Sequence, residues 1–266
     1  MSSLSSRVLV AVVGLPVVLA ALWAGGWWLF GLVVSAGVIA LHEYFVMTRP
    51  LRPVSLAGYA GLAGVLYAVE VSGLAWAVGA LLATLAIAFL LKGIGGTQGS
   101  PTVAVGTTVL GTLWIGLGLG CVLLLRDIPD YGLEVALTVL LAVFADDTAA
   151  YAFGRLFGRH KLAPTISPGK TWEGFVAGTV AAIAVCFIGL YQDRDVFLAM
   201  GEAVLLGLAV AAAAPLGDLF ESMLKRDLGV KDSGRLLGGH GGILDRIDAI
   251  LFAFPAAYFV VAALYL

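Results

Sequence analysis

Apolar segments of about twenty residues follow one another along the whole chain, separated by short joints that contain charges, Gly or Pro. A helix that crosses a bilayer needs about 20 predominantly apolar residues, because the hydrocarbon core is about 30 Å thick. In hydrocarbon every backbone polar group must also be bonded within the structure. Nine segments meet the length requirement. They cover residues 8–24, 27–47, 54–70, 73–91, 102–125, 132–153, 172–191, 200–222 and 243–265.

Composition supports an all-α membrane protein. The chain is 61% hydrophobic and 12% charged, whereas soluble domains are about 45–50% apolar and about 25% charged. We predict a polytopic helix bundle with about nine spans that forms a single integral membrane domain over residues 1–266. The first apolar run lacks a following small-residue cleavage site, so we interpret it as a span rather than a signal peptide. Residues 1–100 carry few charges at membrane depth and are interpreted as scaffold or dimer surface, and residues 101–266 as the catalytic part.

Positive charges indicate the orientation. With the N-terminus inside, 13 of the 15 Lys and Arg residues lie on the cytoplasmic side, and Arg126 and Arg194 lie outside. Short cytoplasmic loops of membrane proteins carry such an excess. We therefore expect a cytoplasmic N-terminus.

Cysteine and histidine usage argues against two kinds of site. Cys121 and Cys186 lie in apolar runs without a second Cys or a His at metal-binding spacing, and only three His are present. Isolated cysteines in apolar runs are typical of small buried hydrophobic residues. A disulfide framework and a multi-histidine metal site are both disfavoured.

Two adjacent acids follow an apolar run in the span 132–153. Asp147 and Tyr151 are four residues apart and share a helix face, whereas Asp146 points elsewhere in that register. Carboxylates at membrane depth are costly unless they meet cations or a metal, so they mark functional sites by default. The alternative is a helix end that already lies in water. We favour a functional role, with Asp147 facing the site.

The segment GRHKLAPTISPGKTWE, residues 158–173, mixes basic residues with Ser, Thr, Pro and Gly. Its tripeptide GKT resembles the end of a phosphate-binding P-loop, but that motif needs Gly at position 164, where this chain has Pro, and a preceding strand. We instead expect residues 167–171 to open a helix, whose N-terminal N–H groups favour an anion, with Lys170 adding a positive charge. Some of the basic residues also fit the positive-inside rule without binding anything.

A third polar segment starts where Pro215 and Gly217 are expected to interrupt an Ala-rich helix just before Asp218. Such an interruption is tolerated at membrane depth where it lines a protein cavity. The polar residues that follow recur on one helix face. They are Asp218, Glu221, Ser222 and Lys225.

Residues 222–248 hold four Asp, two Lys, three Arg and one His, too many charges for a bilayer-spanning segment. The glycines of GGHGG at 238–242 let the backbone approach a ligand closely. Asp245 and Asp248 then share a face at the start of the last span. This stretch is therefore interpreted as a polar loop that binds a highly charged ligand.

These residue types suit one class of chemistry. Mg²⁺ prefers oxygen ligands, usually one or two carboxylates plus substrate phosphates, and Asp218 and Asp245 lie at helix ends that can converge. Cationic side chains spread transition-state charge in phosphoryl transfer, and the candidates are Lys170, Lys225, Arg226 and Lys231. The residues predict metal-assisted phosphoryl or nucleotidyl transfer at the cytoplasmic membrane face, without naming the nucleotide.

Three motifs carry a family resemblance. Residues 222–248 contain SMLKR, KD and HGGILDRID in that order, residues 147–154 read DTAAYAFG, and residues 161–173 read KLAPTISPGKTWE. Together they resemble the phosphatidate cytidylyltransferase, or CDP-diacylglycerol synthase, family. The resemblance covers the second half of the chain, and the first half matches only in hydrophobic character. Asp146 departs from the pattern, which has a small residue there.

The resemblance implies transfer of CMP from CTP to phosphatidic acid, with Mg²⁺ and room for a second cation. It implies Asp218, Asp245 and Asp147 as metal ligands, and Asp218, Lys225, Asp245 and Asp248 as catalytic residues. Substrate binding falls to Asp147, Tyr151, Ser167, Lys170, Thr171, Glu173, Ser222, Arg226, Lys231, Asp232, His240 and Arg246. The family further implies a nine-span homodimer in the cell's inner (plasma) membrane, with its active site facing the cytoplasm. Its partners would be CTP, phosphatidic acid and membrane lipids, and no nucleic acid.

Two other classes stay open from the residues. One is a different CTP-dependent membrane transferase, such as a polyprenol or dolichol kinase, which the complete third segment disfavours. The other is a transporter whose interrupted helix lines a pore. Transporters often have paired interrupted helices in two halves, whereas here the expected interruption and the charges lie in one half.

Overall fold

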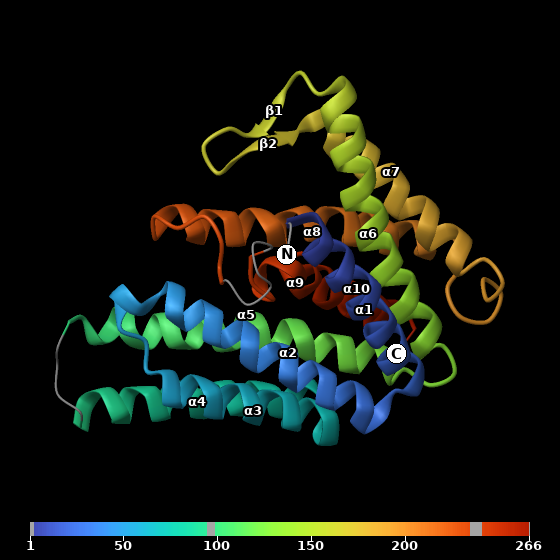
Figure 1. The fold of residues 1–266 in the computed structure, drawn as a ribbon. Coiled ribbons are helices and arrows are strands. Elements are labelled where there is room, and N and C mark those ends of the chain that lie inside the picture. Colours follow the sequence, from blue (N-terminus) through green and yellow to red (C-terminus); the bar gives the residue numbers. More distant parts are fainter. Residues whose placement is uncertain (1–2, 95–98, 235–240, 266) are drawn as a thin grey trace. The chain divides into compact units, whose positions relative to one another are not determined.

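A computed structural model of the chain describes residues 3–94, 99–234 and 241–265, with side chains from residue 14 onward. Helices make up most of this described part, together with one two-stranded hairpin (Figure 1). The chain forms two compact units, Met1–Leu124 with Leu228–Ile247, and Leu125–Asp227 with Asp248–Leu266. The polypeptide therefore leaves the first unit, returns to it and leaves it again. That these units act as one integral membrane domain stays a prediction.

The first unit takes its long helices from the N-terminal half of the sequence. They are α1 (Ser3–Ala24), α2 (Gly26–Met47), α3 (Ser55–Ser72), α4 (Leu74–Ile94) and α5 (Pro101–Arg126), with a 3-10 turn η1 (Arg49–Leu51) after α2. The short helix α9 (Leu244–Ile247) packs against α2. Gly73 ends α3 with a φ of 79°, a left-handed conformation that glycine adopts without steric cost.

Glycines let the helices of this unit approach closely. A Cβ on Gly116 or Gly120 of α5 would press on Val65 or Val69 of α3, and one on Gly61 of α3 would collide with Thr84 of α4. Small residues at membrane helix interfaces allow such contact between backbones. Gly116 and Gly120 therefore serve the packing of α5 on α3.

The second unit holds the remaining long helices and the hairpin. Its elements are α6 (Gly132–Phe157), β1 (Lys161–Ala163), β2 (Ser167–Thr171), α7 (Trp172–Gly189), α8 (Met200–Asp227) and α10 (Ile250–Leu264). In Figure 1, α6 and α7 run side by side and the hairpin projects from their joined ends. A buried stripe of small residues on α7 makes this approach possible. It consists of Gly174, Gly178, Ala182 and Cys186.

Eight helices of the described part are long and apolar enough to cross a membrane. They are α2 to α8 and the combined segment Leu244–Leu264. The protein is thus an all-α, multi-pass membrane protein, as predicted. The ninth expected span, residues 8–24, lies in α1. The part of α1 whose side chains are described, Gly14–Ala24, is an apolar helix. The cytoplasmic N-terminus stays a prediction.

The expectation that residues 167–171 open a helix is wrong. They form β2, which pairs antiparallel with β1 so that Lys161 faces Thr171 and Ala163 faces Ser167. Thr171 is extended, with φ −131° and ψ 155°, and its Oγ1 accepts a hydrogen bond from the Gly174 N–H at 3.2 Å. A threonine that bonds the third N–H in this way is an N-cap, so α7 begins only at Trp172.

The expected interruption at Pro215 is also wrong, because α8 runs unbroken from Met200 to Asp227. Proline removes one backbone donor and crowds the preceding turn. Membrane helices tolerate this where neighbouring helices and polar side chains satisfy the freed groups. Here Pro215 is buried among neighbouring segments of the second unit. Its own carbonyl oxygen, which is not the group that the proline ring frees, also accepts a hydrogen bond from Lys170 Nζ at 3.2 Å.

Candidate active site

Three carboxylates from three helical segments gather in the second unit. Asp147 comes from α6, Asp218 from α8, and Asp248 from the residues just before α10. Asp218 and Asp147 both act electrostatically on Asp248, and Asp218 acts on Asp147. Neighbouring carboxylates repel one another, and a cation among them offsets this repulsion. The cluster therefore favours a positively charged partner.

Gly217 allows α8 to approach the start of α10. A Cβ at this position would run into the carbonyl of Asp248 and the Cα of Ala249. Any side chain here would push the two segments apart. The glycine that the sequence suggested as a helix breaker thus serves to bring Asp218 beside Asp248.

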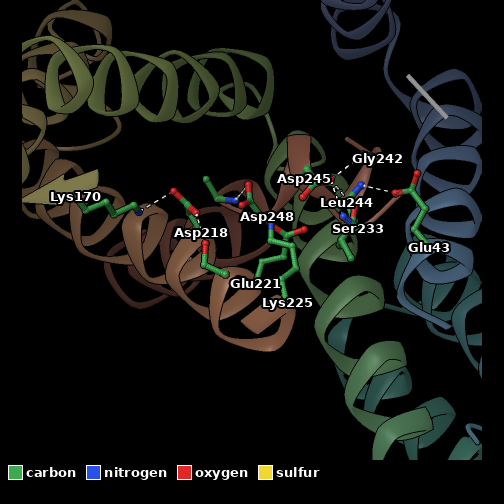
Figure 2. A network of polar contacts seen from close by, with 12 residues as sticks. Glu43, Lys170, Asp218, Glu221, Lys225, Ser233, Gly242, Leu244, Asp245 and Asp248 are labelled. Atoms are coloured by element: carbon green, nitrogen blue, oxygen red, sulfur yellow. Dashed lines mark hydrogen bonds and ion pairs between the residues drawn. The ribbon is translucent and has the colours of Figure 1, made fainter. Parts of the chain in front are cut away.

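Lys170 supplies one cation to the cluster. From β2, its Nζ lies 2.8 Å from Oδ2 of Asp218, with the two side chains 22% and 37% exposed. The other oxygen of Asp218, Oδ1, accepts a hydrogen bond from Ser222 Oγ at 3.2 Å. Figure 2 shows Lys170 extended toward Asp218. A contact of this length between charged groups is a strong, charge-assisted hydrogen bond.

Lys225 of α8 supplies a second cation, about two helical turns beyond Asp218. Its Nζ donates to Oε2 of Glu221 at 2.5 Å, and its charge acts on Asp248. Glu221 is fully buried. A buried carboxylate is costly unless it is paired. The contact with Lys225 therefore explains how Glu221 can be buried on the polar helix face that the sequence predicts.

The two adjacent acids of α6 take different positions. Asp146 is 1% exposed and packs against Gly178 of α7, where any Cβ would collide with its carboxylate. Asp147 is exposed and interacts electrostatically with Lys170 and Asp218. Asp146 also interacts electrostatically with Lys170, but only Asp147 is exposed and interacts with Asp218. That Asp147 is the member of the pair that faces the site stays a prediction.

Asp245 lies in the first unit, where three donors fix one of its oxygens. Oδ2 accepts hydrogen bonds from the N–H of Ser233 at 3.0 Å, from Ser233 Oγ at 2.8 Å and from the N–H of Gly242 at 2.7 Å (Figure 2). Gly241 has a φ of 76°, and a Cβ there would strike this carboxylate. The loop is therefore shaped around Asp245. Convergence of Asp245 with Asp218 stays a prediction, since the two belong to different units.

Glu43 of α2 also reaches this loop. Its Oε2 accepts a hydrogen bond from the N–H of Leu244 at 2.9 Å, although the two residues are 201 positions apart (Figure 2). The side chain is 5% exposed. Glu43 is an isolated charge in the apolar first half of the chain, which the sequence analysis assigns to scaffold or dimer surface. That isolation was the available signal, because an acid at membrane depth is a functional candidate by default.

Several other predicted residues occupy structural contacts. Glu173 lies 2.6 Å from His160 Nδ1 at the base of the hairpin, and Tyr151 accepts a hydrogen bond from Arg155 at 3.0 Å. Ser167 is half-buried in β2. Arg226, Lys231, Asp232 and Arg246 are exposed, as are Asp147 and Tyr151, and His240 lies outside the described residues. Their roles, like those of the whole predicted site, stay predictions.

The donor set fits Mg²⁺. Within the described residues, no group of three or more His, Cys, Asp or Glu side chains lies close enough to form a metal site from protein ligands alone. In phosphoryl transfer enzymes Mg²⁺ is usually held by one or two carboxylates together with substrate phosphates. The carboxylates of Asp218 and Asp248, with Asp147 nearby, are donors of that kind.

Comparison with known proteins agrees with the motifs. Residues 5–264 match the model of the cytidylyltransferase family. A phosphatidate cytidylyltransferase from Staphylococcus haemolyticus is 34% identical over 253 residues, which is 94% of this chain and 95% of that protein.

Two further relatives match over shorter stretches. The phosphatidate cytidylyltransferases of Haemophilus influenzae and Staphylococcus saprophyticus are 45% and 43% identical over 130 and 142 residues. These alignments cover 48% and 53% of this chain, and 45% and 53% of the relatives. The chain therefore spans about half the length of these two proteins in the matched regions.

Proposed function

We propose that this chain, which belongs to the cytidylyltransferase family, transfers CMP from CTP to phosphatidic acid and releases pyrophosphate. The observation that carries the proposal is the polar cluster of the second unit, in which Asp147, Asp218 and Asp248 gather with Lys170 and Lys225. Each of the three family-like motifs contributes to it. The relatives named phosphatidate cytidylyltransferase support the same pair of substrates.

The reaction needs little proton transfer. An oxygen of the phosphatidate phosphate forms a bond to the α-phosphorus of CTP, the bond from that phosphorus to the bridging oxygen breaks, and pyrophosphate leaves with the electron pair. A phosphate monoester has a second pKa of about 6 and is already anionic near neutral pH. A strong general base is therefore unnecessary, and the main task of the protein is to position and neutralise phosphate groups.

Lys170 and Lys225 are suited to that task. Each ammonium already contacts a carboxylate, Lys170 that of Asp218 and Lys225 that of Glu221. An ammonium has three N–H donors, so each lysine can also donate to a phosphate oxygen while it keeps its carboxylate partner. Arg226 and Lys231, which are exposed, would extend this positive surface toward the triphosphate.

Bound Mg²⁺ would be held by Asp218, with Asp147 and Asp248 of the same unit as further candidates, and would neutralise charge on the phosphate oxygens. A role of Asp245 as a metal ligand, which the motifs imply, stays a prediction. We further propose that the site faces the cytoplasm at the inner (plasma) membrane, and that the chain is a homodimer. The distribution of Lys and Arg supports this orientation.

Labelled CTP tests the proposal directly. Purified protein in detergent is given phosphatidic acid, Mg²⁺ and CTP that carries the label either at the α- or at the γ-phosphate. We expect lipid-soluble product only from the α-label. Transfer of the γ-label, to phosphatidic acid or to an added polyprenol, would identify a kinase and refute the proposal. Absence of any product from folded protein would favour the transporter hypothesis.

Variants test the assigned residues. We expect Asp218→Asn and Asp245→Asn to lose label transfer, whereas Asp195→Asn should keep it, because that side chain is 79% exposed in the connection between α7 and α8. Equal activity of Asp245→Asn and the wild-type chain would keep the reaction and remove Asp245 from the site.

A further inference from the structure

Two separate segments of the polar loop bond the carboxylate of Asp245. One segment contains Ser233, which donates through both its N–H and its hydroxyl. The other contains Gly242, which donates through its N–H. In each segment a glycine faces the same side chain of α2: Gly234, which follows Ser233, and Gly242 itself. A Cβ at Gly234 or at Gly242 would lie against the carboxylate of Glu43.

Glu43 also bonds the residue adjacent to Asp245. Its Oε2 accepts the N–H of Leu244, the first residue of α9. The first N–H groups of a helix have no partner within the helix. The carboxylate of Glu43 accepts a hydrogen bond from one of them, and its negative charge interacts favourably with the N-terminal end of the helix. Glu43 therefore contacts both loop segments that hold Asp245 and the turn that carries it.

Burial makes this arrangement demanding. Glu43 is 5% exposed, and its second oxygen Oε1 has no hydrogen-bond partner among the described residues. Keeping a charged group in such a place is costly. An apolar side chain of similar size could pack in α2 without the free-energy cost of burying a carboxylate. We therefore assign Glu43 a role in its hydrogen bond to the loop.

We propose that Glu43 is a positioning residue for Asp245: from α2 it holds the two glycine-containing segments and the first turn of α9 that fix the Asp245 carboxylate. The inference rests on the proposed function for its catalytic consequence. Its structural part, that Glu43 holds the loop, is independent of any reaction. The N-terminal helices, assigned to scaffold from the sequence, thereby contribute a specific group to the loop that carries Asp245.

Activity measurements test the catalytic part. We expect Glu43→Ala to lower kcat about 10- to 100-fold, the range that follows from losing one hydrogen bond to a charged group. The Mg²⁺ concentration for half-maximal rate should rise, while KM for phosphatidic acid stays close to that of the wild type. Glu43→Gln keeps an acceptor oxygen and should recover part of the rate. The matched control is His42→Ala, because His42 precedes Glu43 in α2 but bonds Tyr59 at 2.9 Å.

A double variant tests whether the contact is shared. Gly242→Ala places a Cβ against the Glu43 carboxylate, so it should lower activity in the wild-type chain. In the Glu43→Ala background the same methyl group has room, and the second substitution should add little. Effects that simply multiply would show two independent defects and overturn the proposal, because residues in direct contact are expected to be non-additive.

Hydrogen exchange separates this inference from the proposed function. In Glu43→Ala we expect faster amide exchange in peptides that cover Ser233 and residues 241–245, and unchanged exchange in α3 and α4. Faster exchange in a protein whose wild type makes no CDP-diacylglycerol would leave the positioning role and refute the proposed reaction. An active wild type whose Glu43→Ala variant keeps its rate, its Mg²⁺ response and its loop protection would overturn the inference alone.

Discussion

Replacing Lys170 with Met removes the ammonium that contacts Asp218 at 2.8 Å and the carbonyl oxygen of Pro215 at 3.2 Å. Two unit charges at this separation attract by about 1.5 kcal/mol in water and about 6 kcal/mol at an effective dielectric constant of about 20. Desolvation removes much of that energy, so a hydrogen bond to a charged group nets about 1.5–3 kcal/mol. The partial exposure of both side chains, 22% and 37%, places the pair within this reduced range.

A substrate phosphate that accepts a hydrogen bond from Lys170 would make the same kind of contact. We therefore expect kcat/KM to fall by about 10- to 150-fold in Lys170→Met. The assay is the initial rate of label transfer from α-labelled CTP to lipid, measured over a range of CTP and phosphatidic acid concentrations. Lys170→Arg keeps the charge but not the geometry of the ammonium, and should give an intermediate rate.

The matched control is Lys161→Met. Lys161 is an exposed lysine in β1 of the same hairpin, opposite Thr171, so its removal changes the net charge equally without touching the cluster. We expect its rate to stay within about twofold of the wild type. A folded Lys170→Met protein with a rate within about threefold of the wild type, or an equal loss in both variants, would refute a specific role for Lys170.

Three further outcomes are expected. Gly178→Val should lower the free energy of unfolding by about 1–3 kcal/mol, because the added side chain overpacks against Asp146; Gly106→Ala, which has nothing within 4 Å of the added Cβ, should be neutral or slightly stabilising in thermal unfolding. Tyr265→Ala should lower stability by about 0.5–1.5 kcal/mol beyond the lost burial, since its ring contacts Phe197 at 4.6 Å between centroids, and an unchanged melting temperature would contradict this. Chelation of divalent cations with EDTA should abolish label transfer, Mg²⁺ should restore it, and activity that persists in EDTA would refute the metal dependence.

The helices were predictable because hydrocarbon imposes a length of about 20 apolar residues on each span. The motifs also suggested that Asp147, Lys170 and Asp218 lie close together. Charged residues in a membrane protein are costly unless they pair with opposite charges, so they are expected to cluster. The choice of Asp147 over Asp146 followed from helical register alone and stays a prediction. In the structure Asp146 is buried against Gly178, whereas Asp147 is exposed.

The failures have local physical causes. The strands of the hairpin, three and five residues long, are too short and too rich in Pro and Gly to show an alternating apolar pattern. The continuity of α8 through Pro215 depends on the tertiary burial of this residue, which helix propensities do not take into account. Glu43 was assigned to scaffold because its partner Leu244 lies 201 positions away, and periodicity reports only neighbours along the chain.

The bond from Leu244 to Glu43 has a consequence for the order in which the protein is assembled. During synthesis, α2 precedes its loop partner by 201 residues, so Glu43 waits without this hydrogen bond while the whole of α6, α7 and α8 emerges from the ribosome. Contacts of high sequence separation form late, because the loop-closure entropy must be overcome before they contribute stability. The first unit, being discontinuous, completes its folding only when residues 228–247 return to it. Folding of the first unit therefore ends with the segment that carries Asp245, after α6, α7 and α8 of the second unit have already been synthesised.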